Sequence, residues 1–206
     1  MALDTYANLK TAIADFLNRD DLTNSIDDFI DLAEAHMNRE IRHWDMEKRA
    51  TAVLNTQYTA LPNDFVEPIR FMITDGNTST VEGVSSYEIA RLRMTNNNAT
   101  GRPQNYAVID GSIEVWPSPD TSYTLEMAYY EKIDSLNNST TSNWILTRFP
   151  DAYLYGSLIH SAPYLADDQR IQTWSALYLK AMSDINSENE RSKLGGTGQR
   201  IKIRSY

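Results

Sequence analysis

The chain has 206 residues, of which 41% are hydrophobic, and this is enough apolar material for a sizeable core. It contains no cysteine, which excludes disulfides, thiolate zinc sites and cysteine nucleophiles. No stretch approaches the roughly 20 apolar residues that span a bilayer, and no export signal is visible, so we expect a globular protein that does not contact membranes.

Charge is distributed unevenly along the sequence. The formal net charge is −9, yet residues 191–206 hold five basic residues and no acidic one. Taking these five positive charges away from −9 leaves −14 on residues 1–190, which form an acidic body followed by a basic tail. Such a body repels free nucleic acid. We therefore expect only weak, non-specific contact with DNA, and we expect the tail to reach another surface.

The first fifty residues predict two helices. Asp4 or Thr5 is positioned to cap a helix over residues 6–17, where apolar residues follow helical spacing. Ser25, with an acidic residue three positions on, resembles a capping box for a second helix, and one apolar stripe continues from there to Trp44. The two helices are expected to form a hairpin.

A sheet is predicted from Arg49 onward, because residues typical of strands replace the helical pattern. A strand over residues 65–73 precedes a short helix from Ser85 to Met94. The Asp110-Gly111 pair suits a tight turn with positive φ and indicates a hairpin. Residues 122–130 then alternate as a half-buried strand does.

Helical patterns return in the last third of the chain. Pro150 is positioned to begin a helix, and Pro163 is expected to end or kink it. A final helix is predicted to begin near Asp167 or Asp168, because apolar residues then recur at helical spacing.

These elements predict an α+β fold. The N- and C-terminal helices are expected to pack as one antiparallel helical bundle, with a mostly antiparallel β domain inserted between them and an extended C-terminal arm. The expected domains are a helical hairpin (residues 1–48), a β insert with a short helix (49–136), C-terminal helices that pack on the hairpin (143–190) and the basic arm (191–206).

The arm carries the candidate binding residues of the chain. Basic residues alternate there with isoleucine, a strand pattern that has no neighbouring strand to pair with. One interpretation is a strand donated to a sheet edge on a partner. The alternatives are a disordered end and weak contact with DNA phosphates. The candidate residues are Arg200, Ile201, Lys202, Ile203 and Arg204.

The sequence offers little catalytic chemistry. His36, Glu40 and His43 are spaced to share one helical face, but they lack the His-Glu-x-x-His order of zinc hydrolases. Ser157 and His160 lie close in sequence without a Gly-x-Ser-x-Gly motif. We predict that the protein is not an enzyme and has no catalytic residue, metal or cofactor. We expect three acidic pairs at helix starts, where carboxylates interact favourably with the positive end of the helix dipole. These pairs are Asp20-Asp21, Asp27-Asp28 and Asp167-Asp168.

Several short motifs follow one another along the chain in a characteristic order. They include Arg19-Asp20-Asp21-Leu22-Thr23, Leu61-Pro62-Asn63-Asp64-Phe65, Gly101-Arg102-Pro103, Pro117-Ser118-Pro119, Asn143-Trp144-Ile145-Leu146, Pro150-Asp151 and Pro163-Tyr164-Leu165. In this order and spacing the chain resembles the head-to-tail adaptor proteins of tailed bacteriophages, also called connector or head-completion proteins. The resemblance extends over nearly the whole chain before the basic arm.

The resemblance implies a structural virion protein made in the host bacterial cytoplasm. It implies a homo-oligomeric ring, expected to be a dodecamer, at the head-tail junction under the portal protein. Such a ring extends the DNA channel and offers a platform to tail or nozzle proteins, for which the polar loops 95–100 and 137–142 are candidate contacts. Arms of this family commonly dock on the portal. The alternatives are another neck or tail component, such as a tail terminator or tail-tube protein, and more distantly a small metal-dependent hydrolase.

Overall fold

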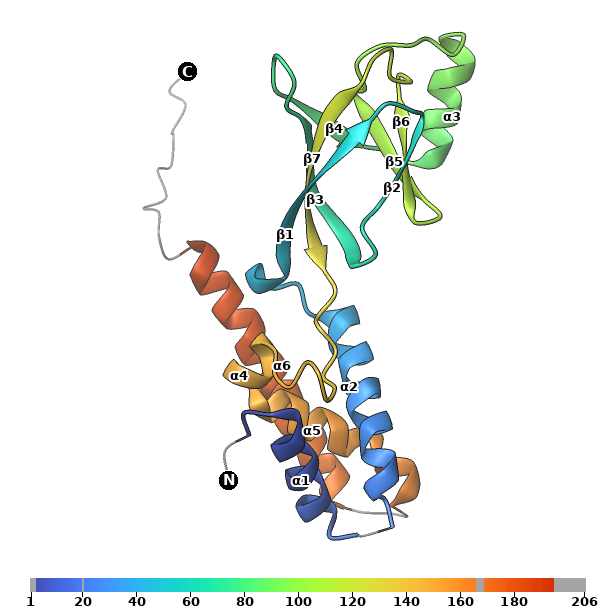
Figure 1. Cartoon of the computed structure of the whole chain (residues 1–206). Helices are drawn as coiled ribbons and strands as arrows, with labels where there is room; N and C mark the ends of the chain where they lie inside the picture. Colours follow the sequence, from blue (N-terminus) through green and yellow to red (C-terminus); the bar gives the residue numbers. More distant parts are fainter. Residues whose placement is uncertain (1–2, 20, 166–168, 195–206) are drawn as a thin grey trace, which may run out of the picture. The chain divides into compact units, whose positions relative to one another are not determined.

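The computed structural model of the chain describes residues 3–19, 21–165 and 169–194 (Figure 1). These residues form two compact units. The helical unit contains the described residues of the two segments 3–45 and 133–194, and the sheet unit contains Met46–Lys132. The sheet unit is therefore one continuous segment, whereas the helical unit is built from both ends of the sequence.

In the described part of the helical unit, α5 is the central helix, because it contacts α1, α2, α4 and α6. The helices are α1 (Tyr6–Leu17), α2 (Ile26–Glu40), α4 (Trp144–Arg148), α5 (Pro150–His160) and α6 (Arg170–Leu194), with 3-10 turns η1 (Thr23–Ser25) and η3 (Ala162–Tyr164). A further turn, η2 (Trp44–Met46), spans the sequence boundary between the units. The buried core includes Leu9, Ile13, Phe29, Ile30, Met37, Ile145, Tyr153, Leu158, Tyr178 and Ile185.

Close packing around α5 depends on Gly156. A Cβ at this position would lie 3.1 Å from Cε2 of Tyr178 on α6 and 3.3 Å from Cβ of Ala33 on α2. Both distances are shorter than ordinary van der Waals contact between carbon atoms. The missing side chain thus allows α5 to lie close to both neighbouring helices.

The helix boundaries confirm some predictions and correct others. Thr5 caps α1, because its Oγ1 accepts a hydrogen bond from the Asn8 backbone N–H at 3.3 Å. The capping box predicted at Ser25 is wrong, since Ser25 lies in η1 and its side chain caps no helix. The second helix also ends earlier than predicted. Ile41 has an extended backbone, so Trp44 lies beyond α2 and does not continue its apolar stripe.

Two polar side chains on α2 hold the segment by which the chain re-enters the helical unit. Asn38 Oδ1 accepts from the Ile133 backbone N–H at 2.8 Å, and Glu34 Oε1 accepts from the Leu136 backbone N–H at 2.7 Å. Glu34 Oε1 also accepts from the Tyr153 hydroxyl at 3.1 Å. Burial raises the pKa of Glu34, although these hydrogen bonds work in the opposite direction.

The sheet unit contains one seven-stranded sheet with the order β1-β7-β3-β4-β5-β6-β2. All neighbouring strands are antiparallel except β4 and β5, which are joined through α3 and run parallel. The edge strands β1 and β2 contact each other, so the sheet curls into a nearly closed barrel. The elements are β1 (Glu47–Leu54), β2 (Tyr58–Ala60), β3 (Phe65–Ile73), β4 (Ser79–Gly83), α3 (Ser86–Thr95), β5 (Asn105–Ile109), β6 (Ser112–Trp116) and β7 (Tyr123–Glu131).

The predicted fold class is therefore wrong. We expected an antiparallel helical bundle with a mostly antiparallel β domain inserted in it, and the structure is instead a mixed α/β fold with a seven-stranded, barrel-like sheet. The physical reason is the separate core of the sheet. Its curled strands bury their own apolar residues, namely Leu54, Leu61, Phe71, Ile73, Val81, Tyr106, Ile113, Val115, Leu125, Met127 and Tyr129.

Local signals in the sheet unit were more reliable than the fold class. Asp110 and Gly111 both have positive φ (47° and 67°) and connect β5 to β6, which confirms the predicted hairpin. Ser85 caps α3 through a 3.2 Å hydrogen bond from the Glu88 backbone N–H to its Oγ, as predicted. The inner face of α3 packs Ile89 against Trp116 and so covers β5 and β6.

Candidate interaction surfaces

The predicted binding residues of the C-terminal arm, Arg200 to Arg204, lie outside the described residues. The described chain ends on α6, whose last turn carries Arg191 and Lys193. The basic character of the tail thus begins on a helix that belongs to the helical unit.

A polar cluster attaches the C-terminal half of α6 to the chain that follows α2. The Trp44 backbone N–H donates to Asn189 Oδ1 at 3.0 Å, and Asn189 Nδ2 donates to the Arg42 carbonyl at 2.9 Å. Arg148 forms ion pairs with Asp45 and with Glu188 of α6. The C-terminal half of α6 is therefore held in place by side chains of the helical unit.

His43 is fully buried within this cluster. Its ring stacks on Trp144 with centroids 4.7 Å apart, and its Nδ1 accepts from the Asp45 backbone N–H at 3.2 Å. Within the described residues, Nε2 has no hydrogen-bond partner. Burial lowers the pKa of His43, although the Asp45 carboxylate works in the opposite direction. The folded protein therefore favours the neutral imidazole.

The histidines do not form the shared helical face that their spacing suggested. His36 lies on α2 with Nε2 3.1 Å from Glu40 Oε1, whereas His43 lies beyond the end of the helix. The rings of His36 and His160 are 6.1 Å apart, and burial and the neighbouring His36 lower the pKa of His160. In the part of the chain that the structure describes, no group of three or more His, Asp or Glu residues is arranged to hold a metal ion.

Ser157 is a packing residue of α5. It is fully buried, and among the described residues its Oγ has no hydrogen-bond partner. Ser161 is also buried and donates its hydroxyl to the Leu158 carbonyl at 2.7 Å. Neither hydroxyl is accessible to a substrate, so the structure gives no support for a serine nucleophile.

Asp27 and Asp28 lie in the first turn of α2, as predicted, where their carboxylates interact favourably with the helix dipole. Asp27 pairs with Lys10 Nζ at 2.6 Å and accepts from the Tyr6 hydroxyl at 2.9 Å. Partial burial tends to raise the pKa of Asp27, but the contacts with Lys10 and Tyr6 outweigh burial and lower this pKa. Of the other predicted acids, Asp21 lies in the turn before η1 and pairs with Arg19, whereas Asp20, Asp167 and Asp168 lie outside the described residues.

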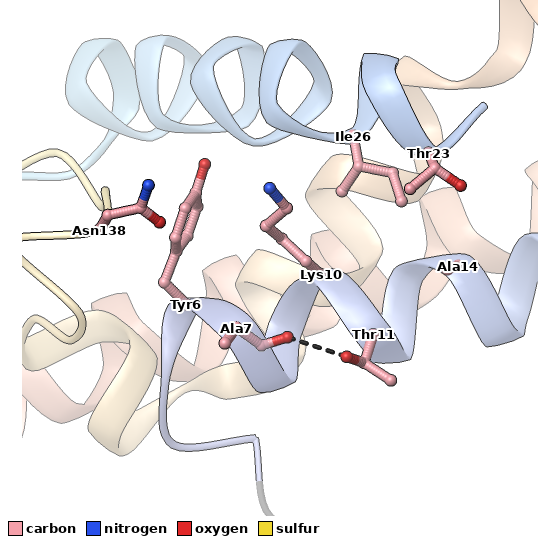
Figure 2. Close-up of a pocket in the computed structure, with 8 residues that line it drawn as sticks. All are labelled: Tyr6, Ala7, Lys10, Thr11, Ala14, Thr23, Ile26 and Asn138. Atoms are coloured by element: carbon pink, nitrogen blue, oxygen red, sulfur yellow. Dashed lines mark hydrogen bonds between the residues drawn. The ribbon is translucent and has the colours of Figure 1, made fainter.

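A groove of about 380 Å³ lies between α1 and α2 (Figure 2). Figure 2 shows Tyr6 and Lys10 of α1 pointing toward α2, where both bind Asp27. The Thr11 hydroxyl, also on α1, donates to the Ala7 carbonyl at 3.0 Å. Since these polar groups already have partners, the groove offers an apolar recess rather than a catalytic site.

The outward face of α3 is a stronger candidate for a contact surface. Tyr87 and Met94 are 78% and 86% exposed, and seven residues place them on the same side of the helix. The loop 95–100, predicted as a candidate contact, follows directly and is exposed. These two exposed apolar side chains make the outward face of α3 a candidate contact surface.

Sequence analysis placed α3 but missed this face. The helix was predicted from its cap and its length, and no assignment of inward and outward residues was made. The spacing of Tyr87 and Met94, with Ile89 and Leu92 between them on the sheet side, is the signal that could have identified it.

Comparison with known proteins gives a family for the chain. A family model described as SU10 adaptor protein matches residues 4–201. No curated protein matches the sequence. Among the described helices, none is long and apolar enough to cross a membrane.

Proposed function

The chain belongs to the SU10 adaptor protein family, a phage adaptor family, and from this premise we propose that its copies form a ring between the portal and the tail of a tailed bacteriophage. Membership makes the chain a structural adaptor protein and places it outside the enzyme families. It also implies a location at the virion neck and contacts with portal and tail proteins. The family match is the observation that carries the proposal, since it covers nearly the whole chain.

The proposed ring is a dodecamer that extends the DNA channel of the portal. DNA must slide through this channel, so a lining that binds phosphates tightly would retard it. The net charge of −9 is consistent with weak contact. We expect duplex DNA to bind the protein weakly, non-specifically and with strong salt dependence, which a titration at two salt concentrations measures.

The arm, Arg200 to Arg204, is proposed to dock on the portal or on a neighbouring subunit as an added strand. Removing residues 197–206 should leave the protein folded, because the described contacts of α6 lie before this segment. Docking on isolated portal should weaken. The matched variant I201S/I203S keeps all the basic charges and replaces only the two apolar side chains, so its docking should weaken as well. Unchanged docking of both variants would contradict strand donation.

The test of the function is to mix the purified chain with isolated portal and, separately, with isolated tail proteins. Electron microscopy should show closed rings of the chain seated on the portal. Binding to the tail component alone would refute the placement between portal and tail.

A further inference from the structure

Two arginines face each other across β7 on the outer side of the sheet. Arg49 on β1 and Arg70 on β3 are both paired in register with Ala128 on β7. Directly paired residues share one face of a sheet, and two strand spacings separate the arginine Cα atoms by about 10 Å. Because the side chain between them is only a methyl group, the three residues form a notch, here called the basic notch.

The basic notch keeps positive charge at the surface. Arg49 and Arg70 are 74% and 53% exposed, and both lie near one carboxylate, that of Glu126, at 2.8 and 3.5 Å. Glu126 itself is only 15% exposed, so solvent and partners meet the arginines first. Spaces of about 350 and 500 Å³ adjoin the notch, and Glu47 and Lys48 also line the larger one. Lys48 is already bound by two carboxylates.

The same chain carries a complementary surface on α2. Asp28 and Asp31 are exposed and three residues apart, so they lie on one side of the helix. Within the described residues neither forms a salt bridge. Leu32 beside them is exposed, as is Ile69 at the edge of the basic notch. Each surface thus offers two like charges beside one apolar side chain, and the charges are opposite.

We propose that Asp28 and Asp31 of one copy dock in the basic notch of the next copy. The inference rests on the proposed ring, because a head-to-tail ring requires two different complementary surfaces on every subunit. An arginine can bind a carboxylate through two parallel hydrogen bonds, so the notch can orient as well as attract the acidic helix. A carboxylate is favoured over DNA phosphate as the occupant, since the chain carries a net charge of −9.

Charge reversal on each side tests the pairing. The variants R49E/R70E and D28K/D31K should each raise the protein concentration needed for ring formation by roughly tenfold or more, because like charges then meet. An equimolar mixture of the two variants should restore rings, since every interface in an alternating ring again joins opposite charges. The control K180E changes an exposed lysine on α6 and should assemble as the unmodified chain does.

Native mass spectrometry measures ring formation, and urea unfolding verifies that each variant is folded. If R49E/R70E does not fold, the neutral variant R49Q/R70Q takes its place in the test. Ring formation by R49Q/R70Q should depend much less on salt concentration than ring formation by the unmodified chain. Normal assembly of folded reversal variants would overturn the inference, and so would normal assembly with loss of DNA binding, which would assign the notch to DNA. Absence of rings for the unmodified chain, with or without portal, would instead refute the proposed ring.

Discussion

Replacing Glu34 tests how the chain is held where it re-enters the helical unit. Glu34→Ala removes the carboxylate oxygen that accepts from the Leu136 backbone N–H and from the Tyr153 hydroxyl. Glu34→Gln keeps an oxygen at the same position and removes only the charge. The two variants therefore separate the hydrogen bonds of this side chain from its ionisation.

The expected magnitudes follow from the burial of each partner. Leu136 is 2% exposed, so an N–H without an acceptor costs about 1–3 kcal/mol. The Tyr153 hydroxyl loses its acceptor but still accepts from Asn143 Nδ2, which adds about 1 kcal/mol. We expect Glu34→Ala to lower the free energy of unfolding by about 2–4 kcal/mol, and Glu34→Gln to change it by less than about 1 kcal/mol.

Ionisation gives the Gln variant a further signature. Burial raises the pKa of Glu34 above its value in the unfolded chain, so the folded state takes up the proton first as the pH falls. The unmodified protein should therefore gain stability relative to Glu34→Gln as the pH falls from the raised folded-state pKa to the unfolded-state pKa. Above that window the charged carboxylate opposes folding.

Urea unfolding, followed by tryptophan fluorescence, measures these free energies. Three of the four tryptophans, Trp44, Trp144 and Trp174, lie in the helical unit and report on it. Hydrogen exchange of the Leu136 amide gives a local readout, and we expect it to accelerate in Glu34→Ala only. A loss below about 1 kcal/mol for Ala, or equal losses for Ala and Gln, would refute the reasoning.

Three other substitutions test the packing. Gly156→Ala should lower stability by about 1–2 kcal/mol despite the better helix propensity of alanine, because its Cβ would press on Tyr178; a stabilised variant in urea unfolding would contradict the close contact. Burial lowers the pKa of His43, so the unfolded chain takes up the proton first as the pH falls. The stability of the protein should therefore fall below about pH 6.5, by at most about 1.4 kcal/mol per pH unit. Urea unfolding at pH 7.5 and 5.5 should show a smaller loss of stability for His43→Asn than for the unmodified protein. Arg93→Ala should cost about 2–4 kcal/mol in thermal unfolding, because Glu114 would remain buried without its cation, and a neutral result would argue against this pair.

Local elements could be predicted from the sequence because their signals lie within a few residues. The caps at Thr5 and Ser85 and the turn at Asp110-Gly111 each depend on hydrogen bonds or φ angles of adjacent positions. The predicted cap at Ser25 failed because η1 precedes α2 without a break, and a serine pattern does not reveal a preceding 3-10 turn.

The curled sheet and the basic notch could not be predicted in this way. β1 pairs with β7, at the opposite end of the sheet unit in sequence, and the parallel pairing of β4 with β5 skips over α3. The notch additionally depends on register shifts in β3 between Phe65 and Glu67 and between Pro68 and Arg70, which set Arg70 opposite Ala128. Neither pairing partner nor bulge position is encoded in the periodicity of a single strand.

The curl of the sheet has a consequence for crowding. The ring proposed above would gather many copies at one vertex, where open strand edges would invite fusion of sheets into aggregates. Here the outermost strands, β1 and β2, contact each other, so the curl brings the two edges of the sheet together. Copies brought together at high local concentration can thus associate through side chains and stay distinct, reversible partners.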